Sequence, residues 1–139
     1  MCLEEASAGH LTATLGGVLS SGNVTALAFS PDGKTLATAF TGGTTALWNV
    51  ATGRGTATLT GPPENVEAIA FSPDGKTLAA GYDDAAARLW AVATKSQIAT
   101  LAGPNPGTYG IDGVAFSPDG KMIADGGLSK GIVYLWDAG

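Results

Sequence analysis

Few side chains in this sequence have the types and spacing that catalysis requires. The single histidine, His10, and the single cysteine, Cys2, lie close together near the start of the chain. Nucleophilic catalysis needs a nucleophile, a base and a third group that orients the base. These two residues do not supply such a trio, so we expect no catalytic residue and no enzyme activity.

The charged residues also lack the pattern of a metal or cofactor site. Asp83 and Asp84 are adjacent, but a hard cation needs more oxygen ligands than two neighbouring carboxylates provide. Lys34, Lys76 and Lys121 each stand two residues after an aspartate, so their fields largely cancel. The glycine pairs lack the strand–glycine–helix context of a phosphate loop. We therefore expect no metal and no cofactor.

The charge balance narrows the range of partners. The chain has 139 residues, with 7 basic and 12 acidic side chains and a net charge of −5. Nucleic acid and anionic membranes are unfavourable partners for a net-negative protein. No apolar run approaches the roughly 20 residues of a membrane-spanning helix, and the start of the chain lacks the pattern of a secretory signal. We expect a cytoplasmic protein that binds neither nucleic acid nor membrane.

One phrase occurs three times in the sequence. "FSPDGKTLA" begins at Phe29 and again at Phe71, and "FSPDGKMIA" begins at Phe116. Tryptophans recur in step with these phrases, and so does the segment "TATL" or "IATL"; the tryptophans are Trp48, Trp90 and Trp136. A shared spacing of 42 to 46 residues indicates an internal repeat.

Each repeat reads as four short strands joined by turns. The first strands should occupy 24–30, 66–72 and 111–117 and end at Ser-Pro-Asp-Gly, in which Pro fixes the first turn position and Gly takes a left-handed conformation. The expected second strands are 35–40, 77–82 and 122–127, the third strands 45–50, 87–92 and 132–137, and the fourth strands 12–15, 56–59 and 98–101. Helical periodicity is absent, so the fold class is all-β.

Both faces of each sheet should be buried, because both sides of the first strand are apolar. One side, the bulky face, carries Leu27 and Phe29 and their equivalents; the other, the small face, carries Val24, Ala26 and Ala28 and their equivalents. We expect the bulky face of each unit to pack into the small face of the next. Three polar residues on the first strands should lie near a channel or rim: Thr25, Glu67 and Asp112.

Four-stranded units of this length, with "FSPDGK" after the first strand and "LW" in the third, resemble the WD-repeat (WD40) family of β-propellers. The resemblance covers roughly residues 11–137. It implies radially arranged blades around a channel and a protein-binding platform rather than an enzyme. The family's closing Trp-Asp pair is present only as Trp136-Asp137, and the family's Asp before Trp only as Asp84. We therefore expect the buried hydrogen-bond network of the family to be broken in every unit, and the fold to be held by packing.

The order of the strands leaves the ring open. The chain begins with a fourth strand at 11–15 and ends after the third strand of the last unit, so its twelve expected strands make three blades only if a neighbouring chain supplies the missing strand. Three blades cannot close a ring, and bare apolar faces and strand edges favour association. We expect a homo-oligomer, with a nine-bladed trimer favoured and a six-bladed dimer as the alternative; a fragment of a longer propeller is the remaining possibility. The closure residues would be Leu11, Thr12, Ala13, Thr14, Leu15, Val133, Leu135 and Trp136.

The domain organisation and the binding face follow from this scheme. Residues 1–10 form a tail before a three-blade domain, 11–139, with the completing strand at 11–15 and blades at 24–60, 66–102 and 111–137. The loops that differ between units should emerge on one face, where diversity on a rigid scaffold builds a binding site. The candidate contacts with a protein or peptide are Tyr109, Asn105, Thr108, Glu64, Asn65, Asp83, Asp84 and Lys130. The alternative function is a self-assembling structural unit with no partner but itself.

Overall fold

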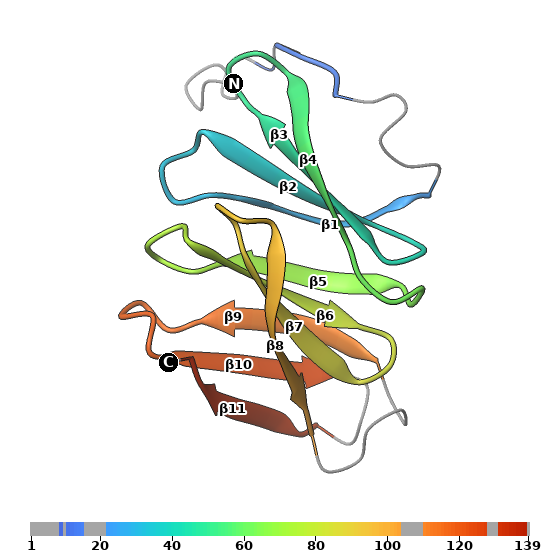
Figure 1. The fold of residues 1–139 in the computed structure, drawn as a ribbon, viewed down its shortest axis with the longest axis vertical. Coiled ribbons are helices and arrows are strands. Elements are labelled where there is room, and N and C mark those ends of the chain that lie inside the picture. The colour runs from blue at the N-terminus through green and yellow to red at the C-terminus, as the bar shows by residue number, and fades with distance from the viewer. Residues whose placement is uncertain (1–8, 10, 16–21, 104–109, 128–130, 139) are drawn as a thin grey trace.

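The fold consists of three antiparallel sheets stacked one on another, as Figure 1 shows. The computed structural model describes residues 9, 11–15, 22–103, 110–127 and 131–138. Sheet 1 contains β1 to β4, sheet 2 contains β5 to β8, and sheet 3 contains β9 to β11, so the described strands form sheets of 4, 4 and 3 strands. The bounds are β1 Val24–Phe29, β2 Thr35–Phe40, β3 Thr44–Asn49, β4 Arg54–Thr60, β5 Val66–Phe71, β6 Thr77–Tyr82, β7 Ala86–Ala91, β8 Ser96–Ala102, β9 Ile111–Phe116, β10 Met122–Gly127 and β11 Val133–Asp137.

The Ser-Pro-Asp-Gly turns end the first strand of every sheet as expected. Gly33, Gly75 and Gly120 have φ values of 71°, 74° and 75°, the left-handed conformation in which a glycine avoids steric strain. In the first turn the Ser30 hydroxyl donates to Asp32 at 2.7 Å and accepts from the Thr35 amide at 3.0 Å. These local bonds fix where each hairpin reverses, independently of tertiary contacts.

A β-bulge shifts the alternation of side chains in all three first strands. The register slips between Val24 and Ala26, between Val66 and Ala68, and at the matching position of sheet 3. Because a bulge inserts one extra residue, the side chain before it moves to the other face. Val66 accordingly joins the cluster of Ile69 and Tyr82 on the bulky face. The expectation that Val24 and its equivalents belong to the small face is therefore wrong.

The sheets pack in the direction opposite to the expected one. The core between sheets 1 and 2 joins the small face of sheet 1, with Ala37, Ala39 and Leu47, to the bulky face of sheet 2, with Ile69, Leu78 and Trp90. The core between sheets 2 and 3 repeats this order, with Ala79 and Leu89 against Val114, Phe116, Ile123 and Trp136. The bulky face of each unit thus packs on the small face of the preceding unit. Strand alternation defines two faces but carries no information on which neighbour covers them.

The two outer faces of the stack remain partly exposed. On the bulky face of sheet 1, Leu27 is 60% exposed, whereas its equivalent in sheet 2, Ile69, is 9% exposed. On the small face of sheet 3, Leu135 is 67% exposed, whereas its equivalents Leu47 and Leu89 are 2% and 6% exposed. The expected burial of both faces therefore holds in this single chain only for sheet 2.

The opening segment, residues 11–15, forms no strand in the single chain, so the described strands number eleven rather than twelve. Leu15 nevertheless packs on a buried cluster of sheet 1 that contains Leu36, Phe40 and Trp48. Figure 1 shows this segment beside sheet 1, at the opposite end of the stack from β11. Its pairing with a neighbouring chain stays a prediction.

Candidate functional site

The turn end of the stack is uniform. In each turn a serine hydroxyl and a lysine backbone amide donate to one carboxylate oxygen, at 2.6–2.7 Å and 2.9–3.0 Å; the carboxylates are Asp32, Asp74 and Asp119. The hydrogen bond from the serine hydroxyl is the largest of the influences that lower the pKa of each carboxyl, followed by the bond from the lysine backbone amide. These groups serve the turns, and three identical copies offer little that would distinguish one partner from another.

The loop end of the stack differs from unit to unit. The Asn65 side chain accepts a hydrogen bond from the Gly42 amide at 3.0 Å and thereby ties a loop of sheet 1 to the start of sheet 2. Asp84 forms a two-pronged ion pair with Arg88, at 2.7 Å and 3.1 Å, and Arg88 also covers the ring of Tyr82. This pair lowers the pKa of Asp84. Two of the expected binding residues are therefore engaged in holding the scaffold.

Exposed carboxylates gather at the loop end. Glu64 and Asp83 are exposed, and so is Asp112 of β9. Burial raises the pKa of Glu67, and the charges of Asp83 and Asp112 raise it further. Sequence reasoning placed Glu67 near a rim but did not predict this group of carboxylates. The group forms only in the folded chain, because Glu67 lies on β5, Asp112 on β9 and Asp83 in a loop.

Four other expected binding residues lie outside the described part of the chain: Asn105, Thr108, Tyr109 and Lys130. Their role stays a prediction, as does that of Glu64 and Asp83. Cys2 and His10 also fall outside the described ranges. Within those ranges no group of three or more His, Cys, Asp or Glu side chains could hold a metal ion, and no helix has the length and apolarity to cross a membrane.

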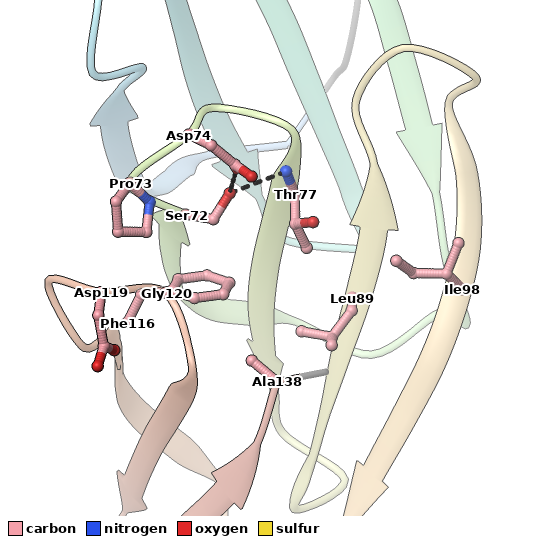
Figure 2. Close-up of a pocket in the computed structure, with 10 residues that line it drawn as sticks. All are labelled: Ser72, Pro73, Asp74, Thr77, Leu89, Ile98, Phe116, Asp119, Gly120 and Ala138. Carbon is pink, nitrogen blue, oxygen red and sulfur yellow. Dashed lines mark hydrogen bonds between the residues drawn. The ribbon is translucent and has the colours of Figure 1, made fainter.

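A pocket of about 240 Å³ opens between sheets 2 and 3 near the turn end, and Figure 2 shows the residues that line it. Leu89 and Ile98 come from sheet 2, Phe116 comes from sheet 3, and Ala138 follows β11 directly. The polar groups at its rim belong to the turns; the Ser72 hydroxyl and Asp74, for example, bond to each other. The pocket is smaller than the roughly 300 Å³ at which ligand sites usually begin. It is best described as a packing gap between two sheets.

The tryptophans show how far the family's buried network persists. Trp48 donates to the Thr38 hydroxyl at 2.9 Å, and Trp136 donates to the Asp125 carboxylate at 2.7 Å. The network was expected to be broken in every unit, but its hydrogen bond from the tryptophan is present in sheets 1 and 3. In sheet 2 the equivalent position is Ala80, and the buried Trp90 indole nitrogen has no hydrogen-bond partner.

Tyr82 lies beside this unpartnered indole. Its hydroxyl is buried and also lacks a hydrogen bond of good geometry. Burial raises the pKa of Tyr82, while the nearby Trp90 indole acts in the opposite direction without a well-aligned bond. The second sheet therefore relies on packing, as expected for all three.

Comparison with known proteins gives a family for this chain. The model of the WD domain, G-beta repeat (WD40) matches three consecutive stretches, 9–49, 53–91 and 95–137. A search of curated proteins found no match. Domains built from WD40 repeats act in general as protein-interaction scaffolds rather than as enzymes. Because the three matches cover most of its length, the chain belongs to the WD40 repeat family.

Proposed function

We propose that this chain is a non-enzymatic protein-binding scaffold, a homo-oligomeric β-propeller that presents the loops of one face to a protein or peptide. The trimer of nine blades is the favoured assembly, with the dimer of six blades as the alternative, and the scaffold is placed in the cytoplasm. The observation that carries the proposal is the contrast between the two ends of the stacked sheets.

The turn end repeats one hydrogen-bonding pattern three times, whereas the loop end carries a different set of side chains in each unit. The Ser30–Asp32 bond recurs in the second and third turns with nearly the same length. At the loop end the side chains change: Thr25 of the first unit is replaced by Glu67 in the second and by Asp112 in the third. Sequence variation confined to one end of a rigid scaffold is typical of a binding surface.

Charge supports a basic partner at this end. Among the described residues, Arg88 is the basic side chain near the loop end, and it is paired with Asp84. Glu64, Asp83 and Asp112 are exposed there. The other described basic side chains lie in or next to the turns of the opposite end: Lys34, Arg54, Lys76, Lys95 and Lys121. A partner surface rich in Lys or Arg would therefore be complementary, and its association would weaken with salt.

The test is a pull-down with two matched double variants of the full chain. Glu64→Gln with Asp83→Asn removes two negative charges at the loop end, and Ala51→Lys with Ala93→Lys adds two positive charges to exposed turns of the opposite end, so both variants change the net charge by the same amount. The proposal expects a partner that is retained by the wild type and by the turn-end variant and lost from the loop-end variant. Equal capture by both variants would contradict it.

The second candidate function is a self-assembling unit whose partner is another copy of itself. The exposed outer faces of sheets 1 and 3 support self-association without any loop-face ligand. Failure of every bait to retain a partner, together with a stable oligomer, would favour this candidate.

A further inference from the structure

The outermost faces of the stack are two halves of a contact that the chain already makes twice. The small face of sheet 1 packs on the bulky face of sheet 2, and the small face of sheet 2 packs on the bulky face of sheet 3. The small face of sheet 3 is left over. On the bulky face of sheet 1, Leu27 and Phe29 are left exposed, whereas the cluster of Leu36, Phe40 and Trp48 is already buried. The two faces are complementary because their residues are the repeat equivalents of the residues that make the two internal contacts.

Leucines of the fourth-strand segments show how this contact is built. Leu59 of β4 lies in the cluster of Leu78 and Trp90 in the next sheet. Leu101 of β8 packs on the cluster of Ile123, with Trp136, in the sheet that follows it. Each leucine thus belongs to one sheet by strand pairing and to the following sheet by packing.

Leu15 occupies the same place on sheet 1. It packs against the cluster of Leu36 and Trp48, the repeat equivalents of Leu78 and Trp90. The family match also begins at residue 9, so that 11–15 holds in the first repeat the position that β4 and β8 hold in the other two. Leu15 therefore already packs on the sheet that follows, as the leucines of β4 and β8 do, whereas residues 11–14 are exposed and have no pairing strand among the described residues.

The strand that lacks a fourth partner is β11. Sheets 1 and 2 pair their third and fourth strands in one register, with Leu47 opposite Ala57 and Leu89 opposite Ala99, followed by a bulge at the tryptophan. Among the described strands, β11 pairs with β10 alone. The same register would place Ala13 opposite Leu135.

The turns supply an independent sign of the same contact. Pro31 of the first turn lies against Gly75 of the second, and Pro73 of the second lies against Gly120 of the third; a Cβ on either glycine would be 3.5 Å and 3.6 Å from the proline ring. Around Gly33, the equivalent glycine of the first turn, nothing lies within 4 Å of that position. This gap would be filled by the proline of a third turn from another molecule.

We infer that the small face of sheet 3 docks on the bulky face of sheet 1 of a second copy of this chain, and that residues 11–15 of that copy pair antiparallel with β11. The pairs are Leu15 with Val133, Thr14 with Tyr134 and Ala13 with Leu135, each joining two copies. The segment keeps its own-chain packing on sheet 1 and gains backbone hydrogen bonds to the neighbour. This inference rests on the self-association in the proposed function and adds its faces, direction and register.

Disulfide trapping in the full chain tests the register. Cys2→Ser removes the native thiol, and Ala13→Cys with Leu135→Cys then places two thiols opposite each other across the contact. The matched control is Thr14→Cys with Leu135→Cys, whose side chains would point to opposite faces of the completed sheet. Ala13, Thr14 and Leu135 are exposed in the single chain, so the substitutions leave its cores intact.

Mild oxidation with diamide should convert the Ala13→Cys variant to species of two or three times 13.8 kDa that revert on reduction, while the control stays at one chain length. Equal cross-linking of both variants, or a disulfide within one chain, would overturn the docking geometry even if light scattering shows the wild type to be an oligomer. A wild type that remains monomeric at all concentrations would instead overturn the self-association on which the inference rests.

Discussion

Truncation of one exposed leucine should weaken assembly without weakening the fold. Leu135 is 67% exposed in the single chain, whereas its equivalents in sheets 1 and 2, Leu47 and Leu89, are 2% and 6% exposed. Docking would therefore bury about two thirds of this side chain, when full burial of a leucine contributes about 1.5–3 kcal/mol. Loss of this burial and the cavity left by Leu135→Ala together cost about 2 kcal/mol per contact, or a weakening of association of about 30-fold.

The assay is molar mass by light scattering over a dilution series, with thermal unfolding as a second readout. Ile98→Ala is the matched control, because Ile98 is 56% exposed on β8 and lies on neither outer face. Leu135→Ala should move the dissociation midpoint to higher concentration, and Ile98→Ala should leave it in place. If the two variants dissociate at the same concentration as the wild type, the proposed role of the sheet 3 face is refuted.

Three further changes probe the fold itself. Ala80→Ser should give the unpartnered indole of Trp90 an acceptor and raise the free energy of unfolding by about 1 kcal/mol, a gain that must vanish when Trp90 is Phe. Burial raises the pKa of Asp125 above its ordinary value of 3.8, so its charge weakens the folded state at neutral pH and protonation stabilises it as the pH falls through the raised pKa. In Asp125→Asn the amide oxygen can still accept the hydrogen bond from Trp136. The variant should therefore be at least as stable as the wild type at pH ~7, and any gain in stability should disappear as the pH approaches 3.8. A variant less stable than the wild type at neutral pH would contradict this. Gly43→Ala should destabilise the chain by at least about 2 kcal/mol in urea titration, since φ is 94° there and a Cβ would overlap the backbone carbonyl of Pro62 in the loop after β4.

The segregation of charge between the two ends has a consequence for assembly. Any ring built head to tail keeps all turns on one face and all loops on the other, so it multiplies the acidic character of the loop end. Glu67 already has a raised pKa in one chain because of burial and the charges of Asp83 and Asp112. A binding partner that neutralises these carboxylates would relieve their repulsion.

The sequence by itself determined the features that depend on local chemistry. The expected strand at 35–40 is β2, and that at 77–82 is β6, because each starts after a Ser-Pro-Asp-Gly turn whose geometry is set by a few neighbouring residues. The spacing of the tryptophans gave three units in register. Apolar residues on both sides of the first strands correctly indicated sheets covered on two faces, which sheet 2 achieves within the chain.

Tertiary structure decided what depends on residues far apart. The bulge beside Thr25 moves the side chain of Val24 to the other face of its sheet. The order of packing is opposite to the expected one, because side-chain alternation defines two faces of a sheet but does not say which neighbouring sheet covers which face. The hydrogen-bond acceptor of Trp136 is the carboxylate of Asp125, eleven residues away, whereas the indole of Trp90 has no acceptor. Each indole reaches one position of the second strand of its sheet, and in sheet 2 that position is Ala80. The place of Leu15 on sheet 1 depends on a cluster that exists only after β2 and β3 have paired. Local propensity sets the strands, and the packing of side chains across sheets sets which contacts they make.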